Sequence, residues 1–281
     1  MLKILLILNK STSLFYLNMP ISEQKLNDFF LEDYEKISEQ EKFYHYSSFE
    51  TSINNIILQQ SLKFSNPIEF NDPFDCSEKL LNIRFNPSHI DEVLKQNHSQ
   101  YNRKDRRSLK IKEIKRQQNA IMKEKREEFK ICCFSGKNDN VLMWSHYAEK
   151  HNGICCGFKF PVNIPKKFAI KPVRYQKSVN KLEGEANLDK IVLYWLTTKS
   201  QIWDYEDEYR AISISKKPSI SYEFINYDLK YLKEIIFGCN VKEKQINATI
   251  KKLKKEIPIK QIEFKRAYLN TPDFNIKIEN I

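Results

Sequence analysis

Glycine is scarce in this chain, with only 5 glycines among 281 residues. Loops that cradle phosphate groups depend on glycine, because the backbone must approach the ligand closely. The sequence contains neither a G-x-G-x-x-G motif nor a G-x-x-x-x-G-K-[ST] motif. These absences exclude the Rossmann and P-loop classes of nucleotide-binding protein.

Segments typical of strands and of helices are mixed along the chain without a regular βαβ alternation. The expected helices cover 22–40, 47–60, 139–153, 187–200 and 241–256. The expected strands cover 43–46, 61–67, 131–136, 154–160, 173–176, 205–214, 234–240, 259–264 and 274–278. This order predicts an α+β fold with mixed or antiparallel sheets and flanking helices, rather than a parallel doubly wound sheet.

The formal charge of +11 is concentrated in two segments. Residues 101–130 hold twelve Lys and Arg against five Asp and Glu, and residues 230–266 hold eleven against four. We expect residues 1–42 to form an N-terminal extension and helix, and 43–281 to form a single α+β domain with a basic helical insertion at 88–130. The apolar run Ile4–Leu8 is too short for a signal peptide or a membrane span, which predicts a soluble cytoplasmic protein without membrane contact.

Six cysteines occur, four of them as the adjacent pairs Cys132-Cys133 and Cys155-Cys156. Neighbours on a strand point to opposite faces, so we expect at most one of each pair to face the core. A zinc site built from Cys133, His146, His151 and Cys155 is conceivable but lacks the tight spacing of known ligand sets. We therefore expect reduced thiols, mostly buried, and no metal.

The segment QIWDYEDEYRAI (201–212) places three acids within five residues, among aromatic residues and directly before an arginine. On a strand, Glu206, Glu208 and Arg210 would share one face. Carboxylates at i and i+2 lie about 7 Å apart and raise one another's pKa when buried. Such carboxylates can act as a general base or stabilise a developing cation, and the alternative is a structural salt bridge between Glu208 and Arg210.

Three further segments carry candidate residues. His45, between tyrosines at 44–46, can donate to a ribose hydroxyl, or it is a core histidine with its hydrogen bonds satisfied. The segment FSNPIEFNDPFD (64–75) adds hydroxyl, amide and carboxylate groups, or serves only to form a turn. In WSHY (144–147), Trp144 and His146 lie on a short helix, and core packing of Trp144 is the alternative.

These elements, taken in order, resemble the bacterial family of unknown function numbered 2971. The resemblance rests on YHYSS, LKFSNPIEFNDPFD, CFSGKNDNVLMWSHYAEKHNGICCGF, VRY, KSQIWDYEDEYR and IIFGC, and extends from about residue 43 to about residue 240. The combination of NDPF, MWSHYA and W-x-YE-x-EYR is its most specific part.

The family resemblance implies an architecture similar to the ADP-ribosyltransferase superfamily, with NAD as the substrate. By that analogy Glu208 stabilises the oxocarbenium-like centre, Glu206 orients the acceptor and His45 anchors a ribose, although either glutamate could be the catalytic one. Arg210 would hold a carboxylate or a phosphate. The implied cofactor-binding residues are His45, Tyr46, Ser65, Asn71, Asp72, Trp144, His146 and Arg210. A bacterial toxin or phage-defence effector that transfers ADP-ribose to a protein or nucleic acid is the expected biological role.

Two other classes of function stay open. The basic stretches 101–130 and 251–255 could bind nucleic-acid phosphates, with strong salt dependence, although no known nucleic-acid motif is present. Alternatively, the NDPF and EYR motifs could be structural signatures of a non-catalytic sensor or partner-binding domain.

Overall fold

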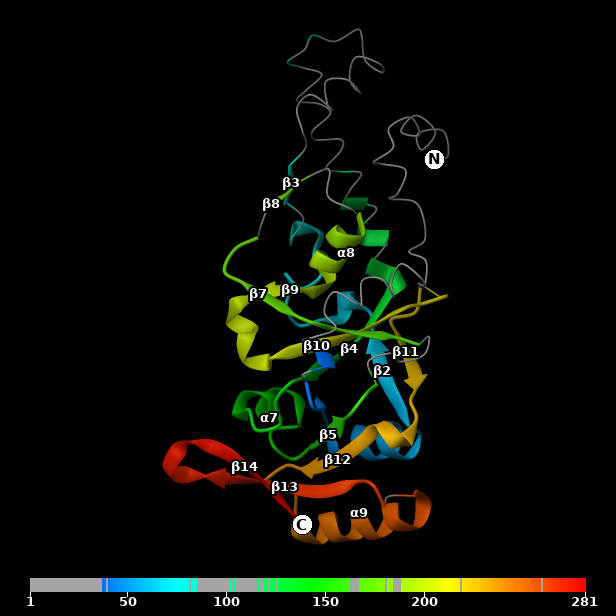
Figure 1. The fold of residues 1–281 in the computed structure, drawn as a ribbon, viewed down its shortest axis with the longest axis vertical. Helices are drawn as coiled ribbons and strands as arrows, with labels where there is room; N and C mark the ends of the chain where they lie inside the picture. Colours follow the sequence, from blue (N-terminus) through cyan, green and yellow to red (C-terminus); the bar gives the residue numbers. More distant parts are fainter. Residues whose placement is uncertain are drawn as a thin grey trace.

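A computed structural model gives the fold (Figure 1). It describes residues 37–38, 40–80, 82–84, 122–124, 126–161, 167–179, 181–183, 188–217, 219–258 and 260–281, with single positions at 102, 104, 116, 119 and 120. Nearly all of the predicted helix at 22–40 and most of the basic insertion at 88–130 therefore lie outside the described residues.

The main sheet has ten strands, and its principal path runs β11-β2-β4-β1-β5-β12-β13-β14, with β10 paired to β4 and β6. Its strands are β1 (Phe43–Ser47), β2 (Ser61–Ser65), β4 (Phe129–Ser135), β5 (Ile154–Phe158), β6 (Ala169–Pro172), β10 (Glu208–Ile214), β11 (Tyr222–Asn226), β12 (Leu232–Phe237), β13 (Glu263–Asn270) and β14 (Asn275–Asn280). Its described pairs are antiparallel except β12–β13. Two short parallel pairs, β3 (Asn82–Arg84) with β8 (Lys181–Glu183) and β7 (Arg174–Gln176) with β9 (Thr198–Ser200), lie outside this sheet.

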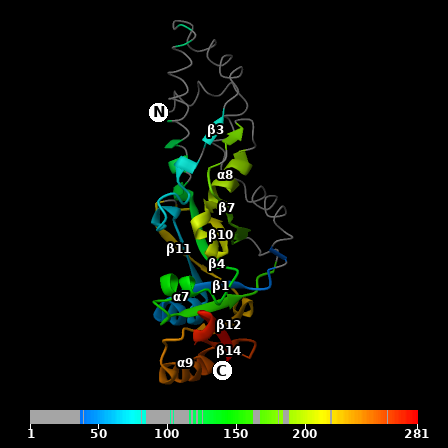
Figure 2. The same ribbon diagram turned by 90° about the vertical axis from the view of Figure 1, so that its left-hand side faces the viewer.

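The described helices alternate irregularly with the strands along the chain. They are α4 (Phe49–Thr51) with its π-helical continuation Ser52–Leu58, α7 (Val141–Tyr147), α8 (Leu188–Thr197) and α9 (Glu243–Glu256), together with the short 3₁₀-helices Pro67–Glu69, Glu78–Leu80, Gln201–Glu206, Leu229–Tyr231 and Thr271–Asp273. In both ribbon views α9 and the β13–β14 hairpin lie at one end of the molecule, far from α8 (Figures 1 and 2). The predicted α+β class, with a mostly antiparallel sheet, is confirmed.

Both faces of the sheet are covered, which overturns one expectation from the sequence. Cys155 and Cys156 are both buried, because Cys155 packs with Trp144 on one face and Cys156 packs with Phe158 on the other. Cys132 faces the same cluster as Cys156, whereas Cys133 borders a third cluster around Trp195. The assumption that one face of each strand is solvated was therefore wrong, and adjacent cysteines can both lie in cores. All six thiols are free.

Strand β4 organises the region around the acidic segment. It pairs with β10 on one side, and with β1 and β2 on the other. In the β4–β10 register, Glu208 lies opposite Ser135 and Arg210 opposite Cys133. Directly opposed residues share a face of the sheet, so these four side chains lie on one face.

Several local predictions were correct and others need correction. The predicted helices at 47–60 and 139–153 form, and Ser48 and Asn140 cap them. Helix α7 ends at Tyr147 and not at Gly153, because the chain takes positive φ angles at 149–151. The predicted helix at 187–200 ends at Thr197 and gives way to β9, and β4 begins at Phe129, inside the segment assigned to the insertion.

The predicted strand at 205–214 begins only at Glu208. Residues Gln201–Glu206 form a 3₁₀-helix, and Asp207 follows in the left-handed conformation with φ of 45°. The regular alternation of acids and aromatics resembled a strand pattern but belongs to a helical turn. No helix among the described residues is long and apolar enough to cross a membrane.

Candidate functional site

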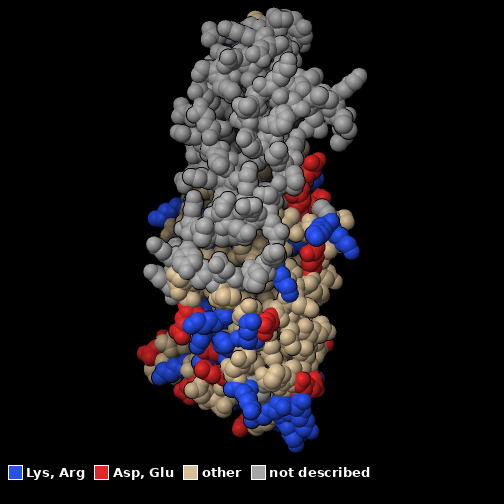
Figure 3. All heavy atoms as spheres, turned by 45° about the vertical axis from the view of Figure 1, so that its right-hand side comes forward, with Lys and Arg blue, Asp and Glu red and all other residues tan. Residues whose placement is uncertain are grey.

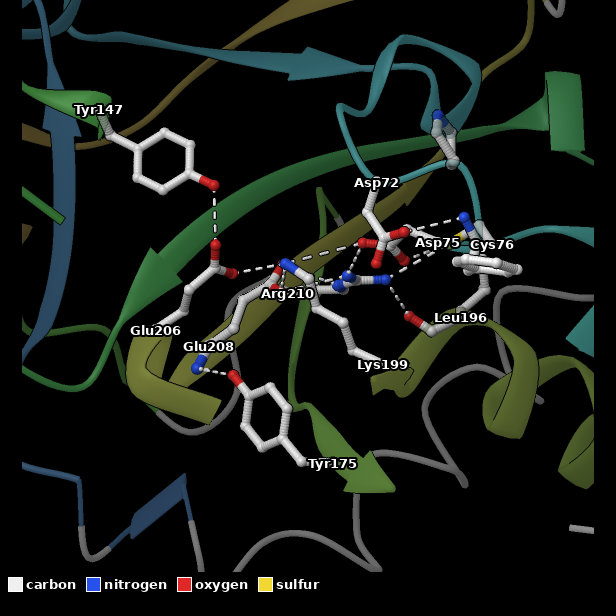
Figure 4. Close-up of polar contacts among 12 residues, drawn as sticks. Asp72, Asp75, Cys76, Tyr147, Tyr175, Leu196, Lys199, Glu206, Glu208 and Arg210 are labelled. Carbon is white, nitrogen blue, oxygen red and sulfur yellow. Dashed lines mark hydrogen bonds and ion pairs between the residues drawn. The ribbon is translucent and has the colours of Figure 1, made fainter. Parts of the chain in front are cut away.

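A buried lysine lies at the centre of a network of ionised side chains (Figure 4). Lys199, on β9, places its Nζ 2.5 Å from Oε2 of Glu206 and 2.9 Å from Oε2 of Glu208. Oδ2 of Asp75 lies 3.8 Å from the same nitrogen. Because Lys199 is only 6% exposed, these contacts replace water as its surroundings.

Arg210 holds the Glu208 carboxylate of this network in place. Its Nε donates to Glu208 Oε1 at 2.8 Å, and one terminal nitrogen donates to Asp75 Oδ2 at 2.6 Å. The other terminal nitrogen donates to the carbonyl of Leu196 at 2.9 Å. The side chains of Glu208 and Arg210 lie on the same face of β10, as the sequence predicted, and both are buried.

Glu206 reaches the network from the 3₁₀-helix rather than from the strand. The turn is held from β4, where Ser135 Oγ donates to the Glu206 carbonyl and the Gly136 amide donates to the Asp207 carbonyl. Helix α7 completes the arrangement, because Tyr147 donates its hydroxyl to Glu206 Oε1 at 2.7 Å. Asn140 of the same region donates to the Tyr205 carbonyl at 2.7 Å.

The pKa values of Glu206 and Glu208 are shifted in opposite directions. Burial raises the pKa of Glu206, and the neighbouring Glu208 charge adds to this, against the opposing effect of Lys199. Burial acts on Glu208 in the same sense, but Arg210 and Lys199 outweigh it and hold the pKa of Glu208 well below its usual value. A pair of carboxyl groups with separated pKa values is the arrangement that divides acid and base roles in enzymes.

Aromatic rings surround the Glu206 end of the network. Lys199 Nζ lies 5.1 Å from the centre of the Trp203 ring, and the Trp203 and Tyr205 ring centres are 6.0 Å apart. The exposed ring of His146 lies 6.5 Å from that of Tyr205 and 6.2 Å from that of Tyr147. These rings form a partly exposed aromatic border beside a buried ionic cluster.

The NDPF turn packs against this cluster. The Asn71 side chain lies within hydrogen-bonding reach of the Tyr147 hydroxyl. Asp72 caps the turn by accepting from the Phe74 amide through Oδ1, while its buried Oδ2 has no hydrogen-bond partner among the residues that the structure describes. The Asp72 carbonyl accepts from the Asp75 amide at 3.0 Å, so the turn that carries Asp72 also delivers Asp75 to Arg210 (Figure 4).

Other predicted site residues lie elsewhere. His45 is opposite Cys156 and donates through Nδ1 to the Cys133 carbonyl at 2.8 Å, with its ring beside Phe134. The side chains of Cys156 and Phe134 lie on the sheet face opposite that of Glu208. Burial lowers the pKa of the His45 imidazole.

Tyr46, Trp144 and Ser65 are likewise separate from the ionic network. The Tyr46 and Trp144 rings are buried and pack edge to face at 5.2 Å, so neither offers a free face for stacking. Ser65 lies opposite Ile131, four residues along β4 from the partner of Glu208. At the usual rise of a strand this separation is about 13 Å.

Four residues of the network were not singled out from the sequence, namely Asp75, Tyr147, Tyr175 and Lys199. Tyr175 accepts from the Glu208 amide at 2.8 Å. All four lie within the quoted motifs, so the motif boundaries carried the available signal. Among the described residues, no group of three or more His, Cys, Asp and Glu side chains could hold a metal ion.

Comparison with known proteins gives one result. The sequence profile of a protein family of unknown function, DUF2971, matches residues 143–211, which run from within α7 through α8 into β10. The chain therefore resembles this family over a stretch that includes MWSHYA and WDYEDEYR, but the match does not include the NDPF turn. No curated protein and no solved structure matches the chain.

Proposed function

We propose that the Glu206–Lys199–Glu208 network is the active site of an ADP-ribosyltransferase-like enzyme that uses NAD. The observation that carries the proposal is the pair of carboxyl groups with opposite pKa shifts on one shared lysine. An enzyme of this kind would suit the expected role as a bacterial toxin or phage-defence effector.

Glu206 is the better candidate for the carboxylate that takes the acceptor's proton, while Glu208 keeps the electrostatic role that the family resemblance implies. Glu208 already accepts from Lys199 and twice from Arg210. Among the described residues Glu206 accepts from Tyr147 and Lys199 alone, which leaves a lone pair on each of its oxygens for a further donor. It also lies next to the aromatic border formed by Trp203 and Tyr205.

The proposed reaction breaks the bond between nicotinamide and ribose, and the electron pair leaves with nicotinamide. The oxocarbenium-like carbon is then attacked by an acceptor, whose proton passes to Glu206. A raised pKa suits Glu206 to this role, because a base works best when its pKa approaches the working pH. Glu208, held ionised, supplies a fixed negative charge beside the developing cation.

The charge balance of the site favours a cationic substrate. Four buried carboxyl groups (Asp72, Asp75, Glu206 and Glu208) lie around two buried cations, Lys199 and Arg210, and a third buried cation, Lys171, lies opposite Arg210 on β6. One carboxylate oxygen, Asp72 Oδ2, has no hydrogen-bond partner in the described part of the chain. The nicotinamide ring of NAD is positively charged, and aromatic rings such as Trp203 attract cations. His45, Tyr46 and Trp144 take no direct part in this proposal, since they lie on the opposite face or in the core.

A second candidate function rests on α9. Six lysines on or directly before this helix are exposed, namely Lys242, Lys244, Lys251, Lys252, Lys254 and Lys255. Lys and Arg gather at the end of the molecule where α9 lies (Figures 1 and 3). Such a surface suits nucleic-acid phosphates, and the affinity would fall steeply with salt. Nucleic acid could also be the acceptor of the transferase reaction.

A third hypothesis is that the Glu206–Lys199–Glu208 network has a purely structural role. Buried ion pairs do not by themselves add stability, but they can favour one fold over its alternatives. A sensor or partner-binding domain built this way would contain the same side chains and would have no activity toward NAD.

Nicotinamide release from NAD by purified variants separates these readings. We expect Glu206→Gln to slow release by at least about 100-fold, as the loss of a general base does. His45→Gln is the matched control, because it changes a buried polar group on the opposite face, and it should keep most of the activity. Equal release by the wild type and Glu206→Gln would refute the role of Glu206.

Ligand-induced thermal stabilisation supplies a readout that does not need turnover. NAD should stabilise the wild type and Glu206→Gln by mass action if the site binds it. A protein that neither gains stability from NAD nor releases nicotinamide has a structural network, and the α9 lysines then become the next target.

A further inference from the structure

Strand β14 forms a free edge of the main sheet. It pairs with β13 on one side, and no described strand pairs with its other side. In Figures 1 and 2 the β13–β14 hairpin lies at the end of the molecule that also carries α9. A free edge presents unpaired amide and carbonyl groups that can bind another strand.

The hydrogen bonds of the hairpin show which residues of β14 face outward. The Ile281 amide donates to the Phe264 carbonyl at 3.0 Å, so position 281 directs its backbone groups toward β13. Backbone direction alternates along an antiparallel strand. Ile276, Ile278 and Asn280 therefore direct their amide and carbonyl groups away from β13, toward the free side.

The exposed side chains of β14 are charged in a self-complementary pattern. Lys277 and Glu279 flank Ile278, and both are exposed. Neither forms an ion pair with another described residue. Proteins commonly protect an edge with like charges that repel a second copy. One lysine and one glutamate two residues apart do not repel an antiparallel copy of themselves.

We propose that β14 pairs with β14 of a second copy of this chain, antiparallel and across a two-fold axis at Ile278, to form a homodimer. In this register Lys277 lies opposite Glu279 of the second copy, and Glu279 lies opposite its Lys277. Both pairs occupy non-hydrogen-bonded positions, where side chains of opposed residues approach most closely.

The neighbouring registers are less favourable. An axis at Lys277 or at Glu279 also joins outward-facing backbone groups, but it places two like charges directly opposite each other. An axis between two residues would place a residue with outward-facing backbone groups opposite one with inward-facing groups, so the hydrogen bonds between the two strands would not form. The Ile278 register is therefore selected by charge and backbone direction together.

Sedimentation equilibrium of the full chain tests the dimer by charge exchange. Lys277→Glu and Glu279→Lys each create two like-charge pairs, and we expect each to weaken association about tenfold or more. The double variant Lys277→Glu, Glu279→Lys restores both opposite-charge pairs and should recover the wild-type association constant. Lys251→Glu, which changes an exposed lysine of α9 in the same way, is the control and should leave association unchanged.

A backbone variant tests the strand pairing itself. Asn280→Pro removes an amide that points away from β13, so the hairpin keeps its own hydrogen bonds while the dimer ladder is interrupted. We expect this variant to be folded and monomeric. The concentration range should extend from about 1 to about 500 μM, since an interface of this small size is weak. A wild type that stays monomeric throughout, or a dimer unaffected by these changes, would overturn the proposal.

Discussion

Replacing Lys199 by Met removes the central cation of the network while keeping a side chain of similar length. Glu208 and Asp75 then keep their ion pairs with Arg210, whereas Glu206 loses its ion-pair partner among the described residues. Removal of one partner from a buried ion pair costs about 3–5 kcal/mol, because it leaves an uncompensated charge out of water. We expect a loss of this size in the free energy of unfolding at neutral pH, measured by urea denaturation.

The loss should depend on pH in a defined direction. Burial already raises the pKa of Glu206 in the folded protein, and without the opposing charge of Lys199 it rises further above its unfolded value. Groups with raised pKa values bind protons more tightly in the folded protein, so stability recovers as pH falls and declines as pH rises. The difference between Lys199→Met and the wild type should therefore be largest near neutral pH and smaller near pH 5.

A second substitution in the same background checks the cause. Lys199→Met combined with Glu206→Gln removes one of the unpaired charges, and we expect it to regain at least about 1 kcal/mol relative to Lys199→Met alone. A loss below about 1 kcal/mol for Lys199→Met, the size of an exposed ion pair, would refute the account of a tightly buried network. A loss that is constant between pH 5 and pH 8 would refute it equally.

Three other predictions concern single side chains. In the wild type the pKa of Glu206 is raised by burial, so the free energy of unfolding should decline as pH rises from the unfolded pKa of about 4.3 through the folded pKa. Glu206→Gln should flatten this decline, measured by urea denaturation between pH 4 and pH 8. Asp72→Asn keeps the acceptor for the Phe74 amide but removes the unpartnered charge; we expect unchanged or higher stability and about tenfold weaker NAD binding by calorimetry. Gly153→Ala should destabilise the fold by about 1–3 kcal/mol, because the added methyl group would collide with the backbone carbonyl of Ser47 on β1; an unchanged melting temperature would contradict this close approach.

Local signals in the sequence identified most of the described elements. Ser48 and Asn140 precede apolar helical segments and act as caps, and the apolar segments at 131–136 and 154–160 form buried strands. These features depend on neighbours within a few residues, which the sequence contains directly. The 3₁₀-helix at Gln201–Glu206 was missed because its acids and aromatics alternate as they would on a strand.

Which residues come together in the site depends on tertiary contacts, which a single sequence does not contain. Glu208 and Arg210 are two residues apart, so their common face followed from strand periodicity alone. Lys199 lies on another strand, and only the pairing of β9 with β7 and the turn at Asp207 bring it to the glutamates. His45 was placed with Glu208 by order along the chain, but order does not determine which face of a sheet a side chain occupies.

The most direct test of the central claim is nicotinamide release from NAD by the purified wild-type protein, with and without added RNA or DNA. The account predicts release that depends on NAD concentration, and an increase with nucleic acid if nucleic acid is the acceptor. No release under any of these conditions, together with no thermal stabilisation by NAD, would contradict it.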